Sequence, residues 1–308
     1  MTLSLASRAS RTSGQRPGVG VSQSVETALG WRTGRSHLLS MALRALLCLL
    51  ALAVFAGPLI VLFSGAFDNN PDPTKLSVLP NSPTLENFKV AGERDVWHYL
   101  ANSLIVAGGA LLLQVSVSVF AAYALARKRF RGRAILSLLF LTTMMLPEEV
   151  IAIPLSLVLG DLPVIHLSLK GTLLGMILPL GAWGFSIFVM TEFMKELPAE
   201  LEEAAKIDGA GEWRIFAQVM LPLCRPALGV ITVFGFIMIW DQYLLPLIVA
   251  NDPSDYTLSV ALSTMRSDTI GPGLVLAGSL LALIPSLIVY LLLQRSLIRG
   301  MTAGALKG

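Results

Sequence analysis

Residues 100–126 read LANSLIVAGGALLLQVSVSVFAAYALA, an apolar run without a single charged side chain. A helix rises about 1.5 Å per residue and the hydrocarbon core of a bilayer is about 30 Å thick, so about 20 such residues cross it. Because backbone polar groups in lipid must be satisfied within their own segment, we predict that this run is a transmembrane helix.

Five similar apolar runs cover residues 43–63, 134–159, 172–194, 226–250 and 274–298. Only 14% of the 308 residues are charged, 54% are hydrophobic, and the mean hydropathy is +0.71. Soluble domains contain about 25% charged residues. We therefore expect an all-α, polytopic membrane protein whose six transmembrane helices occupy residues 44–300.

The two ends of the chain are expected to lie outside this domain. Residues 1–43 are rich in Ser, Thr, Gly and Arg without helical periodicity, which predicts a disordered cytoplasmic tail. Residues 301–308 are expected to form a cytoplasmic C-terminal tail. A cleaved signal peptide is the alternative for the first run, but the tail before it is long for such a signal and the apolar run continues past Val54-Phe55-Ala56.

Basic residues predict the orientation of the six spans. Five of the 23 Lys and Arg residues lie in the loops of one side, and the remaining 18 share the other side with both termini and the cluster Arg127–Arg133. By the positive-inside rule both termini are then cytoplasmic. The basic excess is therefore explained by topology, and a nucleic-acid partner is not needed.

The connection between the fourth and fifth runs, residues 196–223, is predicted to be a short helical hairpin. Acidic residues follow Pro198 at the positive end of a first helix, and Asp208-Gly209 ends it. A second helix, Glu212 to Met220, is expected to place apolar side chains on one face and to stop at Pro222. The side chains expected on that face are Trp213, Phe216 and Val219 or Met220.

This hairpin resembles the EAA loop of binding-protein-dependent ABC permeases. That pattern is Glu-Ala-Ala, three residues, Gly, nine residues, Ile, one residue and Leu-Pro. Here it stands as Glu203-Ala204-Ala205, Gly209, Val219 and Leu221-Pro222, with Val in place of Ile. The resemblance, which covers residues 45–308, implies a type I ABC importer permease fold. It also implies that Glu203, Ala204, Ala205, Asp208, Gly209, Leu221 and Pro222 couple the chain to an ATPase.

Further motifs are similar to the carbohydrate-uptake branch of that family, of the maltose-permease G-subunit and glycerophosphate-permease E-subunit type. They are Tyr123–Arg127, Pro147–Pro154, Trp240–Pro246, Tyr256-Thr257-Leu258 and the ending Gly300–Gly308. In such subunits the C-terminal tail reaches toward the ATPase, which implicates Gly304 and Lys307.

The resemblance implies a transport subunit in a bacterial cytoplasmic (inner) membrane, and not an enzyme. Its expected partners are a second, homologous permease, a cytoplasmic ATPase dimer and an extracytoplasmic solute-binding protein. The sequence contains no G-x-x-x-x-G-K-[ST] phosphate loop, so ATP and Mg²⁺ are expected on the partner ATPase and no cofactor in this chain. No constellation of metal ligands is apparent, and Cys48 and Cys224 are too far apart for a spaced motif.

Polar and aromatic side chains within the spans are candidates for the solute path, because ionisable groups in lipid usually face a cavity or a bundle interior. The candidates are Glu149, Trp183, Trp240, Asp241, Gln242 and Tyr243. The rings of Trp183, Trp240 and Tyr243 would stack on sugar faces. Helix-to-helix hydrogen bonding and interfacial anchoring is the alternative role. The polar residues Asn102, Ser103, Gln114, Ser116 and Ser118 are expected to serve helix packing.

The expected cargo is a sugar, an oligosaccharide or a glycerophosphate-like polyol, moved inward by alternating access. Two alternatives remain open at this point. One is an ABC permease for peptides or amino acids, and the other is a membrane scaffold or membrane-embedded enzyme without a transport role.

Overall fold

The computed structural model describes residues 22–69, 71, 77–267 and 271–305, and within them the regular elements are helical. In chain order the elements are α1 (Ser22–Ala66), α2 (Glu86–Glu93), α3 (Val96–Arg127), α4 (Arg133–Thr143), α5 (Glu148–Gly160), α6 (Leu173–Leu180), α7 (Gly184–Glu196), α8 (Glu200–Ile207), α9 (Glu212–Arg214), the π-helix η1 (Ile215–Met220), α10 (Leu221–Leu223), α11 (Arg225–Trp240), α12 (Leu244–Val249), the 3₁₀ turn η2 (Pro253–Asp255), α13 (Leu258–Ser267) and α14 (Pro272–Ala305). The chain divides into two units, residues 1–58 and 59–308.

In the first unit, residues 22–58 form most of the long helix α1. Its part from Ser40 onward is apolar enough to span a membrane, in agreement with the predicted first span. The helix begins at Ser22, however, and not near Leu43, so the prediction of disorder was wrong for residues 22–43. No proline follows Pro17 until Pro58, and nothing in this segment breaks a helix once it has started. Residues 1–21 lie outside the described residues.

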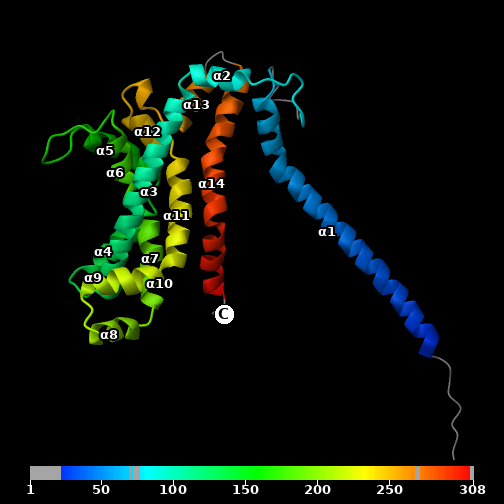
Figure 1. Ribbon diagram of the computed structural model, residues 1–308, viewed down its shortest axis with the longest axis horizontal. Helices are drawn as coiled ribbons and strands as arrows, with labels where there is room; N and C mark the ends of the chain where they lie inside the picture. Colours follow the sequence, from blue (N-terminus) through cyan, green and yellow to red (C-terminus); the bar gives the residue numbers. More distant parts are fainter. Residues whose placement is uncertain (1–21, 70, 72–76, 268–270, 306–308) are drawn as a thin grey trace, which may run out of the picture. The chain divides into compact units, whose positions relative to one another are not determined.

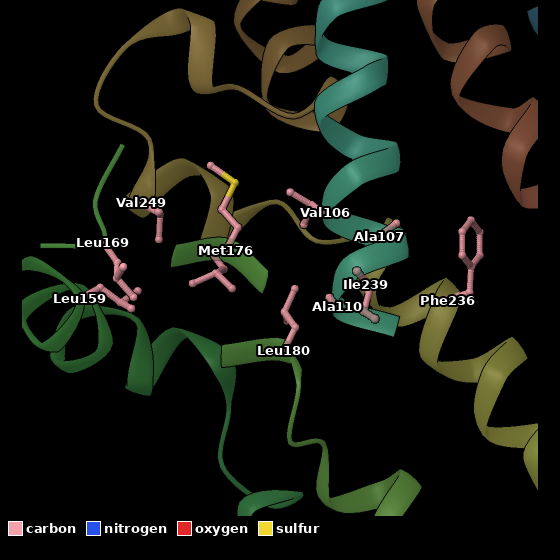
Figure 2. Packing of buried hydrophobic residues seen from close by; sticks show 11 residues of the cluster. Val106, Ala107, Ala110, Leu159, Leu169, Met176, Leu180, Phe236, Ile239 and Val249 are labelled. Atoms are coloured by element: carbon pink, nitrogen blue, oxygen red, sulfur yellow. The ribbon is translucent and has the colours of Figure 1, made fainter. Parts of the chain in front are cut away.

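In the second unit, α3 is the central helix and packs against α6, α7 and α11, while α11 also packs against α14. Figure 2 shows one of the resulting cores, in which Val106, Ala107 and Ala110 of α3 face Met176 and Leu180 of α6. Phe236 and Ile239 of α11 complete this cluster from the other direction. Small residues on α3 let the neighbouring backbones approach closely, as is common between membrane helices.

One of the predicted spans is a broken helix, and a second bend lies where the predicted hairpin meets the fifth span. The run 134–159 folds as α4 and α5, whose axes differ by 108° across Met144–Pro147, and the segment Glu212–Leu223 meets α11 at 73°. Pro147 lacks a backbone N–H and disfavours helical geometry in the residue before it, which accounts for the first break. Four helices are long and apolar enough to cross a membrane, or up to six if each bent pair is one span. This agrees with the expected count of six.

Figure 1 places α8, α9 and α10 at one end of the second unit, and α2, α12 and α13 at the other end. Lys128, from the basic cluster, forms an ion pair with Glu212 at the α8 end. The basic cluster and the hairpin thus share one end, as the charge pattern predicted. Which end faces the cytoplasm stays a prediction from the positive-inside rule.

Polar side chains on α3 make interhelical bonds at two depths. Near the middle, the buried Gln114 donates from Nε2 to Oγ of Ser186 on α7, at 2.7 Å. At the α13 end, Asn102 Nδ2 donates to the carbonyl oxygens of Ser254 and Tyr256, at 2.9 and 3.0 Å. Ser103 Oγ accepts from the backbone N–H of Leu258 at 2.8 Å. The prediction of a packing role is confirmed for Asn102, Ser103 and Gln114.

We predict that Asn102→Ala loosens the segment 254–258. The substitution leaves two partly buried carbonyl groups without their donor, which costs about 1–3 kcal/mol. Hydrogen exchange at these amides should speed up, and the apparent melting temperature in detergent should fall. Ser116→Ala is the matched control, because Ser116 Oγ bonds only to the carbonyl of Leu112 in its own helix. It should change stability by no more than about 0.5 kcal/mol. Equal exchange in both variants would contradict the assignment.

Candidate functional site

The hairpin predicted at residues 196–223 is present, and its first helix is α8. The helix ends in a Schellman motif, in which Ala210 N–H donates to the carbonyl of Ala205 at 2.9 Å and Gly209 N–H to that of Lys206 at 3.0 Å. Gly209 has φ +77°, a left-handed conformation that costs other residues about 1–2 kcal/mol. The glycine of the motif is therefore the residue that reverses the chain.

The coupling residues of α8 do not all face the same way. Glu203, Ala204 and Ile207 are exposed, and Ile207 has 87% of its surface open. Glu202 and Ala205 are half-buried on the opposite face. Spacings of three and four residues put Glu203, Ala204 and Ile207 on one side of the helix. We call this side the α8 outer face. It offers a carboxylate, a small side chain and an apolar side chain to a partner.

The second helix of the hairpin, residues 212–223, packs onto the ends of α3 and α7. Phe216 is buried there with Met190 and Met194 of α7, and Met220 is buried as well. Trp213 stays 69% exposed although its ring stacks near Phe120. Residues Ile215–Met220 form a π-helix, so Ile215 is buried as well. Pro222 does not stop the helix as we expected, because it lies in the first turn of α10, where no N–H is needed.

Arg127, the last residue of α3, joins α8 to the bundle. Its Nη2 donates to the carbonyl oxygens of Met194 and Leu197, at 2.6 and 2.7 Å, at the C-terminal end of α7. Its Nε lies 3.1 Å from Oε1 of Glu202 in the first turn of α8, and the two side chains are only 10% and 12% exposed. Sequence reasoning placed Arg127 in the basic cluster and in the family motif Tyr123–Arg127, but it did not find the contact with Glu202. The two residues are 75 positions apart, and no local pattern links them.

A second, more exposed group of contacts holds the second helix of the hairpin. Lys128 forms an ion pair with Glu212, and Tyr123 Oη donates to the same carboxylate at 3.1 Å. The hydrogen bond with Lys128 lowers the pKa of Glu212, and the same bond raises the pKa of Lys128. Both groups therefore stay charged through the physiological range. The end of α3 thus holds both helices of the hairpin.

A cavity of about 350 Å³ lies between α5, α6, α11 and α12. Its polar lining includes Glu148, Gln242 and Thr143, and Trp183 is also a lining residue. Gln242 Nε2 donates to Oε2 of Glu148 at 3.3 Å. Most of the remaining lining is aliphatic. This volume lies within the range of about 300–1,000 Å³ that small-molecule sites occupy, and an apolar wall with a few polar groups is typical of them.

The structure brings two of the six path candidates, Trp183 and Gln242, into this cavity and adds Glu148. Glu149 is the next residue on α5, and successive helical side chains point about 100° apart, so only Glu148 reaches Gln242. The other candidates do not line the cavity. Trp240 Nε1 donates to the carbonyl of Ala282 on α14 at 3.2 Å, Tyr243 Oη accepts from Ser263 at 3.0 Å, and Asp241 is exposed.

The remaining predicted sites are placed as follows. Gly304 lies near the end of α14, and Lys307 lies outside the described residues. The thiol of Cys224 is buried, and burial raises its pKa to about 11, so it is protonated at neutral pH. Over the described ranges, no group of three or more His, Cys, Asp or Glu side chains is arranged to hold a metal ion.

Similar proteins include several transport permeases. The diacetylchitobiose uptake system permease protein DasC of Streptomyces coelicolor is 36% identical over 74% of this chain and 83% of its own length. The sn-glycerol-3-phosphate transport system permease protein UgpE of Salmonella typhi is 33% identical over 82% of this chain and 92% of its own. The arabinooligosaccharides transport system permease protein AraQ of Halalkalibacterium halodurans is 32% identical over 74% of this chain and 81% of its own length.

The fold has a counterpart among solved structures. A chain from a bacterial ABC transporter that imports the acidic polysaccharide alginate superposes with a TM-score of 0.73, at 24% identity, over 85% of this chain and 97% of that one. The family model for the inner membrane component of binding-protein-dependent transport systems matches residues 114–302, which is more than half of the chain. The protein therefore belongs to the family of binding-protein-dependent transport system inner membrane components.

Proposed function

We propose that this chain is one of two transmembrane subunits of an ABC importer, with the α8 end in the cytoplasm. A cytoplasmic ATPase dimer binds the α8 outer face, a second permease completes the translocation path, and an extracytoplasmic binding protein delivers the solute. The observation that carries this proposal is that Glu203, Ala204 and Ile207 are exposed together on one face of α8, in a hairpin attached to the spans. Membership of a transport family supports the same assignment.

The proposed mechanism is alternating access. ATP binding closes the partner ATPases, the closure displaces α8, and the displacement moves the spans to which the hairpin is attached. The chain itself supplies no nucleotide chemistry, since its sequence has no phosphate-binding loop. The bent pair α4–α5 and the interruption between α11 and α12 at residues 241–243 support this role, because non-helical backbone at membrane depth is tolerated where it lines a cavity.

For the cargo we propose a neutral carbohydrate. The Trp183 ring offers an apolar face for a sugar ring, and Glu148 and Gln242 offer an acceptor carboxylate and an amide for hydroxyl groups. A phosphate or carboxylate on the solute would face the carboxyl group of Glu148, and such a juxtaposition of acidic groups disfavours an anionic solute. Among the cargo classes that the relatives' names suggest, the lining therefore favours a neutral sugar over a glycerophosphate-like polyol.

The first prediction tests the coupling face. Glu203→Lys should abolish uptake in cells and reduce recovery of the ATPase in affinity purification by tenfold or more, since losing a buried interfacial charge pair costs about 2–5 kcal/mol. Membrane insertion, measured by fractionation, should not change. Glu93→Lys is the matched control for ATPase recovery, because Glu93 is an exposed acidic residue at the end of α2, at the opposite end of the unit from α8. Normal uptake by the Glu203 variant would count against the proposal.

The second prediction separates the two carboxylates of α5. Glu148→Gln should lower uptake of a neutral saccharide roughly tenfold, because a hydrogen bond to a charged group contributes about 1.5–3 kcal/mol. It should also make a phosphorylated polyol a better competitor. Glu149→Gln should leave uptake within about twofold, since Glu149 points away from Gln242. The measurement is initial-rate uptake of labelled saccharide, and a larger loss at Glu149 than at Glu148 would rule out this cavity as the path.

A further inference from the structure

The groups that fasten α8 to the spans are few. Among the neighbouring elements, α8 packs mainly against η1 of its own hairpin. Its direct polar link to the spans is the ion pair between Glu202 and Arg127, whose nitrogen and oxygen lie 3.1 Å apart. Movement of the α8 outer face can therefore reach the bundle by two routes: this ion pair and the packing of α8 on the second helix of the hairpin.

The guanidinium of Arg127 connects three elements at once. Its Nη2 binds the last carbonyl groups of α7 through Met194 and Leu197, and its Nε faces Glu202 on α8. A guanidinium is planar, and its fixed fork of nitrogens places Nη2 on the two carbonyl groups while Nε forms an ion pair with Glu202 without a hydrogen bond. The three partners are therefore held in one geometry. A lysine in this place has a single ammonium on a flexible stem and would keep the charge but lose that fork.

Burial indicates that this contact determines geometry more than stability. Arg127 is 10% exposed and Glu202 12%, and a buried ion pair commonly contributes no more stability than well-packed apolar side chains of the same volume. The packing of Phe216 and Leu221 already attaches the hairpin to α7. The ion pair adds a defined register between α8 and the ends of α3 and α7.

We propose that Arg127 is a positioning residue that transmits the displacement of α8 to α3 and α7. The inference rests on the proposed function, since it takes the ATPase to be the source of that displacement. From Arg127 the movement passes along α3 to its other end, where Asn102 and Ser103 bind the segment 254–258. Nucleotide bound to the ATPase should therefore alter this distant segment through α3.

The test uses the full complex of this chain, its partner permease and the ATPase dimer in nanodiscs. Two variants, Arg127→Lys and Glu202→Gln, are compared with the wild type and with Arg129→Lys. Arg129 is the matched control, because it is an exposed basic residue two positions further along the same rim. Three quantities are measured: the ATPase recovered with the chain, the rate of ATP hydrolysis, and the change in hydrogen exchange at residues 254–258 when Mg²⁺ and AMP-PNP are added.

In the wild type and the control, AMP-PNP should change exchange at residues 254–258. In Arg127→Lys and Glu202→Gln, ATPase recovery and hydrolysis should stay within about twofold, while the exchange response falls roughly tenfold, toward the upper range for coupling losses. The double variant should lose no more of the exchange response than either single variant, because both substitutions disrupt the same Arg127–Glu202 contact. A merely structural role would not separate the exchange response from ATPase recovery.

Three outcomes would overturn the inference. Loss of the ATPase in the single variants would show that Arg127 only folds the hairpin, and an unchanged exchange response would show that it transmits nothing. A wild-type complex that binds the ATPase but shows no response at residues 254–258 would exclude transmission along α3 and leave the proposed function standing. A wild-type chain that recovers no ATPase at all would remove the proposed function itself.

Discussion

A helix at the end of a bundle passes force to the spans only through the atoms that attach it. In this protein that constraint falls on a small contact region, where the end of α3 meets the end of α7 and the hairpin α8–α10. Apolar packing supplies the attachment and the buried guanidinium of Arg127 supplies the register. A partner that binds the exposed face of α8 could therefore move α3 and α7, because these contacts attach the opposite face of the helix to the bundle.

Polar groups along α3 extend this attachment to the opposite end of the molecule. Asn102, Gln114 and Arg127 lie near the start, the middle and the end of one helix of 32 residues. Asn102 binds the segment 254–258, Gln114 binds α7 at Ser186, and Arg127 binds both the end of α7 and the hairpin. Buried polar groups carry a desolvation cost unless they are paired, so their placement on a single helix ties several neighbours to it. Helix α3 is therefore suited to act as the strut between the two ends of the unit.

The sequence predicted the features that depend on local patterns. Apolar runs of span length, the distribution of Lys and Arg, and the residues of the EAA pattern predicted the helical class, the shared end of the basic cluster and hairpin, and the reversal at Gly209. These features follow from the bilayer thickness and from the backbone freedom of glycine, which act within a few turns of one segment.

Features that depend on distant partners were missed. The choice between Glu148 and Glu149 follows from the side of α5 that faces Gln242, and no pattern within 147–154 reveals it. The pairing of Arg127 with Glu202 and the contact of Trp240 with Ala282 likewise arise only when separate helices pack. The helix at 22–43 was missed for another reason, since a polar composition lowers hydropathy without preventing a helix.

The central claim is that the α8 outer face is where a nucleotide-hydrolysing partner binds. Its most direct test is cross-linking of the purified complex, with a photoreactive amino acid placed in turn at position 207 on α8 and at position 97 at the other end of α3. The account predicts that position 207 cross-links to the ATPase and that position 97 does not, because Ile207 and Trp97 are both exposed but lie at opposite ends of the bundle. Cross-links to the ATPase from position 97 alone, or from neither position, would contradict it.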